Sequence, residues 1–161
     1  MCKGRRRRCH LASNVREILY ALRAVTPIMK VQKYGRIVNV ASITGKNGDH
    51  STVFVYGASK GAVISLTRSV ARQLGAVRDH LNATAPHAAM TEMMRYWTEE
   101  KECKAVEAIP VRRLGTAQEV AHPICLLSLD GSSFISGETV NISGGYYTWT
   151  EWPVPEWVAR L

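Results

Sequence analysis

The chain has 161 residues and a formal net charge of +8, with 46% hydrophobic and 21% charged residues. This length suits one domain with a hydrophobic core, and the composition is that of a globular protein rather than a disordered or fibrous one. No apolar run approaches the roughly 20 residues that a membrane-spanning helix requires, so we expect no membrane segment.

Residues 1–13 form a basic segment in which Lys3 and the run from Arg5 to Arg8 gather positive charge. We interpret it as a solvated terminus and do not expect nucleic-acid binding, although a nucleic-acid contact or a localisation signal is the alternative. No apolar segment follows the arginines as it would in an export signal.

The spacing of the cysteines fits no metal site, and we expect free thiols, no bound metal and a cytoplasmic protein. The four residues concerned are Cys2, Cys9, Cys103 and Cys125.

A helix is predicted after His10, with Asn14 at its head in a position where asparagine commonly caps a helix. Pro27 interrupts the pattern, so a kink or a break is expected there. Apolar residues recur at helical spacing and predict one buried face: Val15, Ile18, Leu19, Leu22 and Val25.

The next predicted element is a strand from Arg36 to Ala41, which ends at Ser42. Its nearly continuous apolar character is typical of a parallel strand covered on both faces. Residues 45–51, which are rich in glycine, asparagine and aspartate, predict a flexible connector.

A second helix is predicted from about Val53 to Leu74, and it carries Tyr56 and Lys60 four residues apart on one face. A nearby ammonium favours the phenolate, which lowers the pKa of a tyrosine and suits it to acid or base chemistry. Ser42 could bond the same substrate oxygen. The predicted buried positions are Val55, Ala58, Ala62, Val63, Leu66, Val70 and Leu74.

Small residues on this second helix, such as Gly57 and Gly61, permit close approach of another backbone, either within this chain or in a second subunit.

Beyond this helix we expect a strand over residues 80–86, a mixed helical stretch from Thr91 to Ala108, and a helix opened by the capping box Thr116 to Glu119. That last helix is predicted to bury Val120, Ile124 and Leu127. The segment 146–161 is a tryptophan- and proline-rich tail that either docks on a neighbouring subunit or is a poorly ordered extension.

Four segments together resemble the short-chain dehydrogenase/reductase family over residues 14–145. They are the strand into the serine (34–42), Tyr56-x-x-x-Lys60, the small-residue stretch 58–62, and Ser-Gly-Glu-Thr-Val-Asn-Ile-Ser-Gly-Gly at 136–145. The resemblance implies an α/β fold, a Rossmann-like doubly wound parallel sheet, of which this chain carries only the C-terminal strands and helices. Within the family, the chain resembles ketoreductases such as 3-oxoacyl-carrier-protein reductases.

The resemblance also implies roles for individual residues. Tyr56 would be the general acid or base and Ser42 would orient the substrate carbonyl. Lys60 would support Tyr56 and hold the nicotinamide ribose, and Asn14 would hold a water in a proton relay, as an alternative to capping.

Cofactor contacts implied by the family fall on Tyr56, Lys60, Pro86, His87 and Thr91. Family members usually carry glycine where this chain has His87, and histidine would cost energy if the position needed a positive φ. The family's region corresponding to Thr91–Ala108 is a lid over the substrate.

The glycine-rich turn that binds the dinucleotide pyrophosphate in this fold has no counterpart before Asn14. The strand from Arg36 to Ala41 would then be an apolar edge.

Two functions stay open. One is an oxidoreductase using NAD or NADP on a small carbonyl or alcohol, with the two long helices pairing subunits into a dimer or tetramer. The alternative is a truncated, inactive chain that acts through subunit association.

Overall fold

The computed structural model describes residues 12–48, 54–75 and 79–147. Its three strands are β1 (Gly35–Val40), β2 (Asp79–Pro86) and β3 (Thr139–Ile142), which form one parallel sheet in the order β1-β2-β3. Arg36 pairs in register with His80, and Val40 with Thr84. The carboxyl ends of the strands therefore meet at one edge of the sheet.

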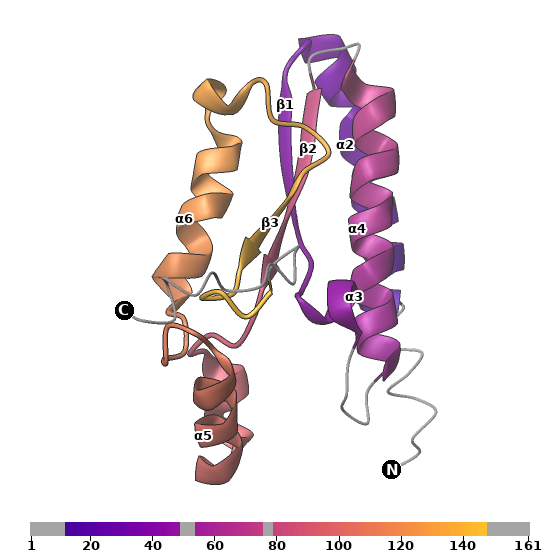
Figure 1. The fold of residues 1–161 in the computed structure, drawn as a ribbon. Helices are drawn as coiled ribbons and strands as arrows, with labels where there is room; N and C mark the ends of the chain where they lie inside the picture. The colour runs from indigo at the N-terminus through magenta and orange to yellow at the C-terminus, as the bar shows by residue number, and fades with distance from the viewer. Residues whose placement is uncertain (1–11, 49–53, 76–78, 148–161) are drawn as a thin grey trace, which may run out of the picture.

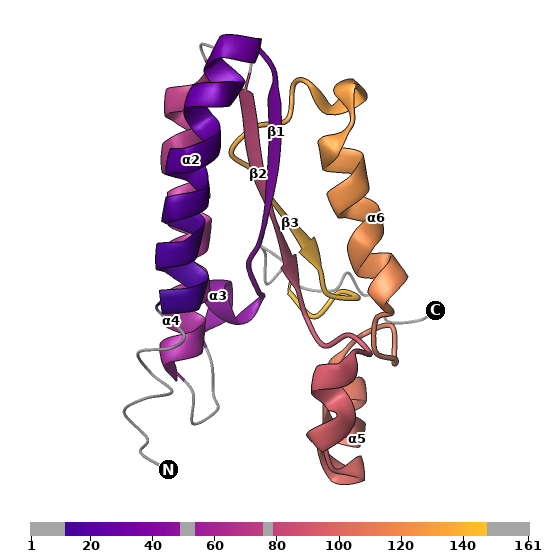
Figure 2. The same cartoon turned by 180° about the vertical axis from the view of Figure 1, so that it is seen from behind.

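Helices cover both faces of this sheet (Figures 1 and 2). Helices α2 (Glu17–Gln32) and α4 (Phe54–Leu74) lie on one face, and α6 (Ala117–Ser128) lies on the other. A parallel sheet needs crossover connections and is covered on both sides by them. The predicted α/β fold with a Rossmann-like, doubly wound parallel sheet is confirmed.

The first helix begins with a π-helical turn, η1 (Ala12–Arg16), and continues without interruption as α2. Pro27 lies inside α2, so of the expected kink or break the helix does not show the break. Proline has no N–H, so one carbonyl of the preceding turn lacks its helical donor. In the same turn, Thr26 Oγ1 donates to a different carbonyl, that of Leu22, at 2.6 Å. The predicted buried face is also only partly right, because Leu22 is buried whereas Leu19 and Val25 are exposed.

Strand β1 is an edge strand in the described part of the chain; helices pack on both of its faces as predicted, and only its last residue is exposed. Val40 is 45% exposed, whereas Asn39 is buried and donates a hydrogen bond to Thr67 Oγ1 at 3.0 Å. A polar side chain in a covered position is tolerated because it has a partner. The expected apolar edge is therefore present at Val40.

Helix α4 turns most of its predicted face inward, but it also buries polar residues that were not predicted. Ser59 and Thr67 are fully buried, Ala58 is exposed, and Val63 and Leu74 are buried as expected. Thr67 Oγ1 also donates to the carbonyl of Val63 at 2.8 Å, which satisfies its hydroxyl within the helix. The buried polar residues on α4 thus have hydrogen-bond partners that a hydropathy pattern does not reveal.

The core between the sheet and the two long helices has two clusters. One is built on Leu22, Ala71 and Leu81, and the other on Ala41, Val63 and Ile64. Complete burial of a leucine or isoleucine side chain contributes about 1.5–3 kcal/mol. These clusters fix the distance between β1 and α4, on which the site described below depends.

The predicted connector after β1 begins as a short helix, α3 (Thr44–Asn47), and residues 49–53 lie outside the described residues. Gly45 lets α3 approach α4, since a Cβ at this position would lie 2.6 Å from the carbonyl carbon of Lys60. The expected close approach of a backbone at Gly61 is confirmed, and its partner is α3 of the same chain.

The stretch expected to be helical from Thr91 to Ala108 divides into η3 (Glu92–Tyr96) and α5 (Glu99–Ala108). Helix α5 lies beyond the carboxyl ends of the strands (Figure 1) and buries none of its residues. The capping box of α6 is confirmed, with Thr116 accepting from the Glu119 N–H at 3.2 Å and Glu119 accepting from the Thr116 N–H at 2.8 Å. The short helix η4 (Asp130–Ser132) follows.

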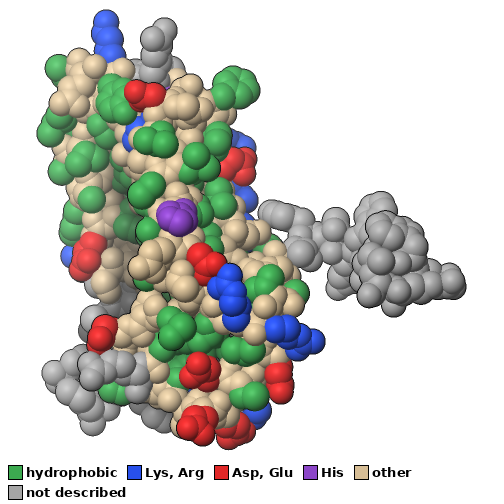
Figure 3. All heavy atoms as spheres, turned by 90° about the vertical axis from the view of Figure 1, so that its left-hand side faces the viewer, with side chains coloured by type: hydrophobic (Ala, Val, Ile, Leu, Met, Phe, Trp, Pro, Cys, Tyr) green, Lys and Arg blue, Asp and Glu red, His purple; other side chains and the backbone are tan. Residues whose placement is uncertain are grey.

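Leu127 of α6 is buried as predicted, whereas Val120 and Ile124 are only partly buried. Figure 3 views the α6 side, where hydrophobic side chains are scattered over the upper part and charged side chains gather below. Leu126 of α6 is exposed, as are Leu129 and Phe134, which follow this helix in the sequence.

Within the described ranges, no helix is both long and apolar enough to cross a membrane, and no three His, Cys, Asp or Glu side chains gather as a metal site would require. Cys103 and Cys125 are exposed free thiols, whereas Cys2 and Cys9 lie outside the described residues. The basic segment before residue 12 and the tail from residue 148 lie outside them as well.

Candidate active site

Ser42 lies just past the carboxyl end of β1 and is buried. Its Oγ accepts hydrogen bonds from the Thr44 hydroxyl at 2.9 Å and from the Thr44 N–H at 3.3 Å. Two backbone bonds tie this turn to β2, from Ala41 N to Thr84 O at 2.8 Å and from Ile43 N to Pro86 O at 3.0 Å. The serine hydroxyl is thus held in a fixed position at the edge of the sheet.

Tyr56 and Lys60 lie in the first two turns of α4, on the side that meets the end of β1. Lys60 Nζ donates to the carbonyl of Val40 at 2.7 Å and lies 5.8 Å from the centre of the Tyr56 ring. Burial lowers the pKa of Lys60 because the ammonium loses part of its hydration. The lysine therefore links the strand before Ser42 to the helix that carries Tyr56.

Asn14 belongs to the π-helical turn η1 and contacts α4 through its side chain. Its Nδ2 donates to Ser59 Oγ at 2.9 Å, and Ser59 Oγ donates to the carbonyl of Tyr56 at 2.7 Å. Asn14 is thus bonded to the neighbouring helix rather than to an N–H of its own helix, unlike a capping residue. Single π-helical turns are frequent at functional sites.

The end of β2 supplies Pro86 and His87. The His87 N–H donates to the carbonyl of Ile142 at 2.9 Å, and its imidazole stacks on Tyr146 with ring centres 3.9 Å apart. The non-glycine residues with positive φ in the described part of the chain are Lys33 and Arg112, so histidine at position 87 carries no such backbone strain. Burial lowers the pKa of His87, which keeps the imidazole neutral near pH 7.

A cavity of about 600 Å³ joins these elements at the carboxyl ends of the strands. Its lining includes every predicted site residue except Asn14, namely Ser42, Tyr56, Lys60, Pro86, His87 and Thr91. Met94 and Trp97 from the region of η3, with Ala105 and Ala108 of α5, contribute apolar wall. Substrate and cofactor sites in open α/β sheets lie at this edge.

Sequence reasoning missed three residues at this site. Thr44 positions Ser42, Tyr146 stacks on His87, and Lys46 donates to Thr139 O and Asn141 Oδ1 and so holds α3 against β3. A threonine two residues after the serine is a usable signal, because Ser and Thr hydroxyls bond locally in turns. Neither the stacking of Tyr146 nor the reach of Lys46 has a local signal, because both contacts join distant segments.

Comparison with known proteins agrees with this geometry. The family model described as enoyl-(acyl carrier protein) reductase matches residues 6–147. The chain belongs to the short-chain dehydrogenase/reductase family. A curated family member, the 3-oxoacyl-[acyl-carrier-protein] reductase of Staphylococcus epidermidis, is 31% identical over 135 residues, which cover 84% of this chain and 55% of the relative.

Solved structures of short-chain dehydrogenase/reductases superpose on the same fold. A 3-oxoacyl-[acyl-carrier protein] reductase from Brucella melitensis with bound NAD is 32% identical, with a TM-score of 0.82, covering 91% of this chain and 54% of that one. ElxO with NADP bound is 31% identical, with a TM-score of 0.77, covering 83% and 54%. The chain spans about half the length of the relatives that it matches.

Proposed function

We propose that this chain supplies the catalytic part of an NAD- or NADP-dependent oxidoreductase that interconverts a carbonyl and an alcohol. The observation that supports this function best is the meeting of Ser42, Tyr56 and Lys60 in one cavity at the carboxyl edge of a parallel sheet. The turn after β1 supplies Ser42 and helix α4 supplies Tyr56 and Lys60, and packing of α4 against β1 brings the two segments together.

In the direction of reduction, the Tyr56 hydroxyl donates its proton to the carbonyl oxygen of the substrate. Ser42 donates a hydrogen bond to the same oxygen, because its Oγ already accepts from Thr44 and its own proton is directed elsewhere. The Lys60 ammonium stabilises the phenolate that remains on Tyr56. Asn14 positions the backbone of Tyr56 through Ser59 and contributes to the relay that returns the proton.

The nicotinamide cofactor, when bound, supplies the hydride that reaches the carbonyl carbon. The cavity fits the nicotinamide end of such a cofactor, because it combines an apolar wall with the Lys60 ammonium and the backbone of residues 86–91. His87 and Tyr146 form an aromatic surface beside this space. The relatives with bound NAD and bound NADP leave the choice between the two nucleotides open.

The described residues hold no glycine-rich turn between a strand and a helix to receive the pyrophosphate. We therefore propose that the phosphates and adenosine are held by a polypeptide segment beyond the described residues or by another subunit. The names of the relatives suggest a 3-oxoacyl-[acyl-carrier-protein] as the substrate class. We propose the cytoplasm as the setting. Subunits would pair through α2, which exposes Tyr20, Ile28 and Val31, and α4, which exposes Phe54.

Titration with NADH and NADPH, followed by nicotinamide fluorescence, tests this function. We expect saturable binding that is lost in Lys60→Ala and retained in Lys101→Ala, since Lys101 is an exposed lysine on α5. Absence of binding by both nucleotides would refute a working cofactor site in this chain.

Association without catalysis is a second candidate function, which the exposed edge at Val40 favours. A chain of this kind would bind related subunits and show no turnover. Size-exclusion chromatography together with the nucleotide titration separates the candidates, because assembly without nucleotide binding supports association alone.

A further inference from the structure

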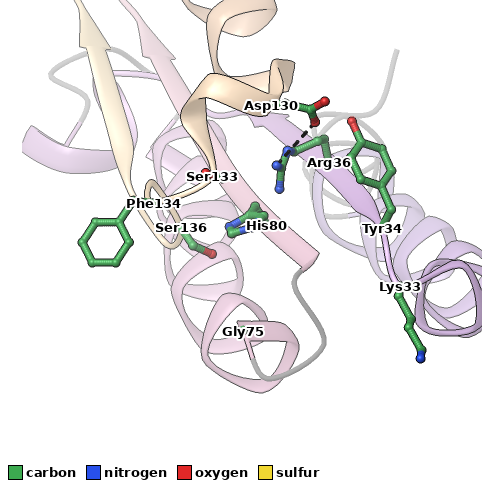
Figure 4. Close-up of a pocket in the computed structure, with 9 residues that line it drawn as sticks. All are labelled: Lys33, Tyr34, Arg36, Gly75, His80, Asp130, Ser133, Phe134 and Ser136. Carbon is green, nitrogen blue, oxygen red and sulfur yellow. Dashed lines mark ion pairs between the residues drawn. The ribbon is translucent and has the colours of Figure 1, made fainter.

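A second cavity, of about 840 Å³, lies at the amino ends of the strands, at the opposite edge of the sheet from the candidate active site. Figure 4 shows Arg36 and His80 near its centre, with Asp130 beside Arg36 and with Lys33 and Phe134 extending outward. None of its lining residues contributes to the proposed reaction.

Arg36 is a buried cation with incomplete compensation. Its side chain is only 9% exposed, and among the described residues its Nε and Nη1 have no hydrogen-bond partner, although the guanidinium lies 5.3 Å from the centre of the Tyr34 ring. The carboxylate that pairs with it in the described part of the chain, Asp130, lies 3.7 Å from Nη2, is itself 81% exposed, and also accepts from the Tyr34 hydroxyl. Buried charges normally have close partners, because the loss of hydration is costly.

The neighbouring strand adds a second polar group without a partner. His80 pairs in register with Arg36, so the two side chains leave the same face of the sheet, and His80 Nδ1 is buried with no hydrogen-bond partner in the described part of the chain. The hydroxyls of Ser133 and Ser136 line the same cavity. Hydrogen-bond donors thus gather around the guanidinium, and Asp130 is the one carboxylate among the lining residues.

We propose that this cavity binds the phosphate group of a small organic phosphate ester, with Arg36 as the principal contact and His80 and the two serines as supporting donors. Phosphate carries up to two negative charges and three acceptor oxygens, and arginine is well suited to bind it. A carboxylate is already present in Asp130, yet it reaches only Nη2 and leaves Nε and Nη1 without hydrogen-bond partners among the described residues. The volume exceeds that of phosphate alone, and the exposed rings of Tyr34 and Phe134 at the rim suit an organic group.

Two substitutions are expected to act in opposite directions. Arg36→Met removes the principal contact and should weaken binding about tenfold or more, as expected for loss of a charge-assisted hydrogen bond. Asp130→Asn removes the competing carboxylate and should tighten binding. A merely structural Arg36–Asp130 pair would not produce tighter binding in Asp130→Asn.

The experiment is calorimetric titration of the full chain with inorganic phosphate, phenyl phosphate and phenol in buffer with moderate salt. We expect both phosphates to bind, phenyl phosphate more tightly, and phenol not to bind. Arg23→Met, which removes an exposed arginine of α2 that does not line the cavity, controls for net charge. Circular dichroism confirms that each variant is folded.

Equal binding to wild type and to Arg36→Met would overturn the assignment, because other positive charges of the chain would then account for it. Absence of saturable binding by either phosphate would also overturn it. If Arg36→Met does not fold, Asp130→Asn decides, since its side chain is exposed and unchanged or weaker affinity in that variant contradicts the site.

Discussion

The two edges of this sheet differ in how completely their partly buried cations are paired. At the carboxyl edge, Lys60 donates to the Val40 carbonyl at 2.7 Å, which fixes the strand against the helix. At the amino edge, Arg36 lies over the ring of Tyr34 and meets the exposed Asp130 at 3.7 Å, the one carboxylate that pairs with it among the described residues. Paired groups hold a fixed geometry, as acid–base chemistry requires, whereas a cation without close partners retains the capacity to bind an anion.

The arginine–carboxylate pairs show the same contrast. Arg113 makes two hydrogen bonds to Glu119, at 2.9 and 2.6 Å, near the start of α6. Arg36 and Asp130, near the end of the same helix, make one long contact. The first pair therefore leaves the guanidinium little capacity for a ligand, and the second leaves much of it.

The largest effect is expected from Tyr56→Phe, which removes the proposed proton donor from the carboxyl edge. The rate of carbonyl reduction should fall about 10²–10⁴-fold, the usual contribution of a positioned acid. Nucleotide binding should change little, because the ring and Lys60 remain. Steady-state kinetics measures this rate in whichever oligomer shows carbonyl reduction. Tyr20→Phe is the control, because Tyr20 is an exposed tyrosine of α2. Equal loss in both variants would contradict the assignment.

Gly45→Ala tests the close approach of α3 to α4 beneath Lys60. The new methyl would lie 2.6 Å from a backbone carbon, so the free energy of unfolding should fall by about 1–3 kcal/mol. Urea denaturation measures this. Gly131→Ala is the matched control, since no described atom lies within 4 Å of a Cβ added at Gly131. A neutral Gly45→Ala would show that α3 can move away from α4.

Replacing each cation by methionine compares the two edges directly. Lys60→Met leaves the Val40 carbonyl without its donor and should cost about 1 kcal/mol of unfolding free energy. Arg36→Met removes a poorly compensated buried charge, leaves Asp130 in solvent, and should be neutral or stabilising. Urea denaturation of both variants in the same buffer would contradict the comparison if Arg36→Met were the more destabilising.

The smallest effect concerns pH and Glu119. The Arg113 guanidinium, with the Thr116 N–H, holds the pKa of Glu119 at about 2, below the ordinary value of 4.5. A depressed folded-state pKa contributes stability above the unfolded value, and this is lost as pH falls through the folded value. The stability difference between wild type and Glu119→Gln should therefore shrink from about pH 5 to about pH 2 in thermal denaturation. A constant difference would exclude this linkage.

Much of the fold could be predicted because its signals are local. The strand before Ser42, the helix that carries Tyr56 and Lys60, and the Thr116 capping box depend on neighbouring residues and on backbone hydrogen bonds. Burial was predicted less well. Ala58 is exposed and Ser59 is buried, because the orientation of α4 is set by the sheet and by η1 rather than by its own hydropathy.

The candidate site likewise has a part that local sequence signals predict and a part that depends on contacts between distant segments. The order and spacing of Ser42, Tyr56 and Lys60 indicated a shared site, and the structure places all three around one cavity. The stacking of Tyr146 on His87 could not be predicted, because it joins segments that lie far apart in the sequence.

The sequence by itself determined the elements, their order and the residue types available for chemistry, because helix and strand formation depend mainly on local periodicity. Only the tertiary structure decided which groups meet. Arg36 and His80 become neighbours through the register of β1 with β2, and Asp130 reaches them from the end of α6. The physical reason is that burial and electrostatic compensation depend on long-range packing, which brings together residues that no short stretch of sequence relates.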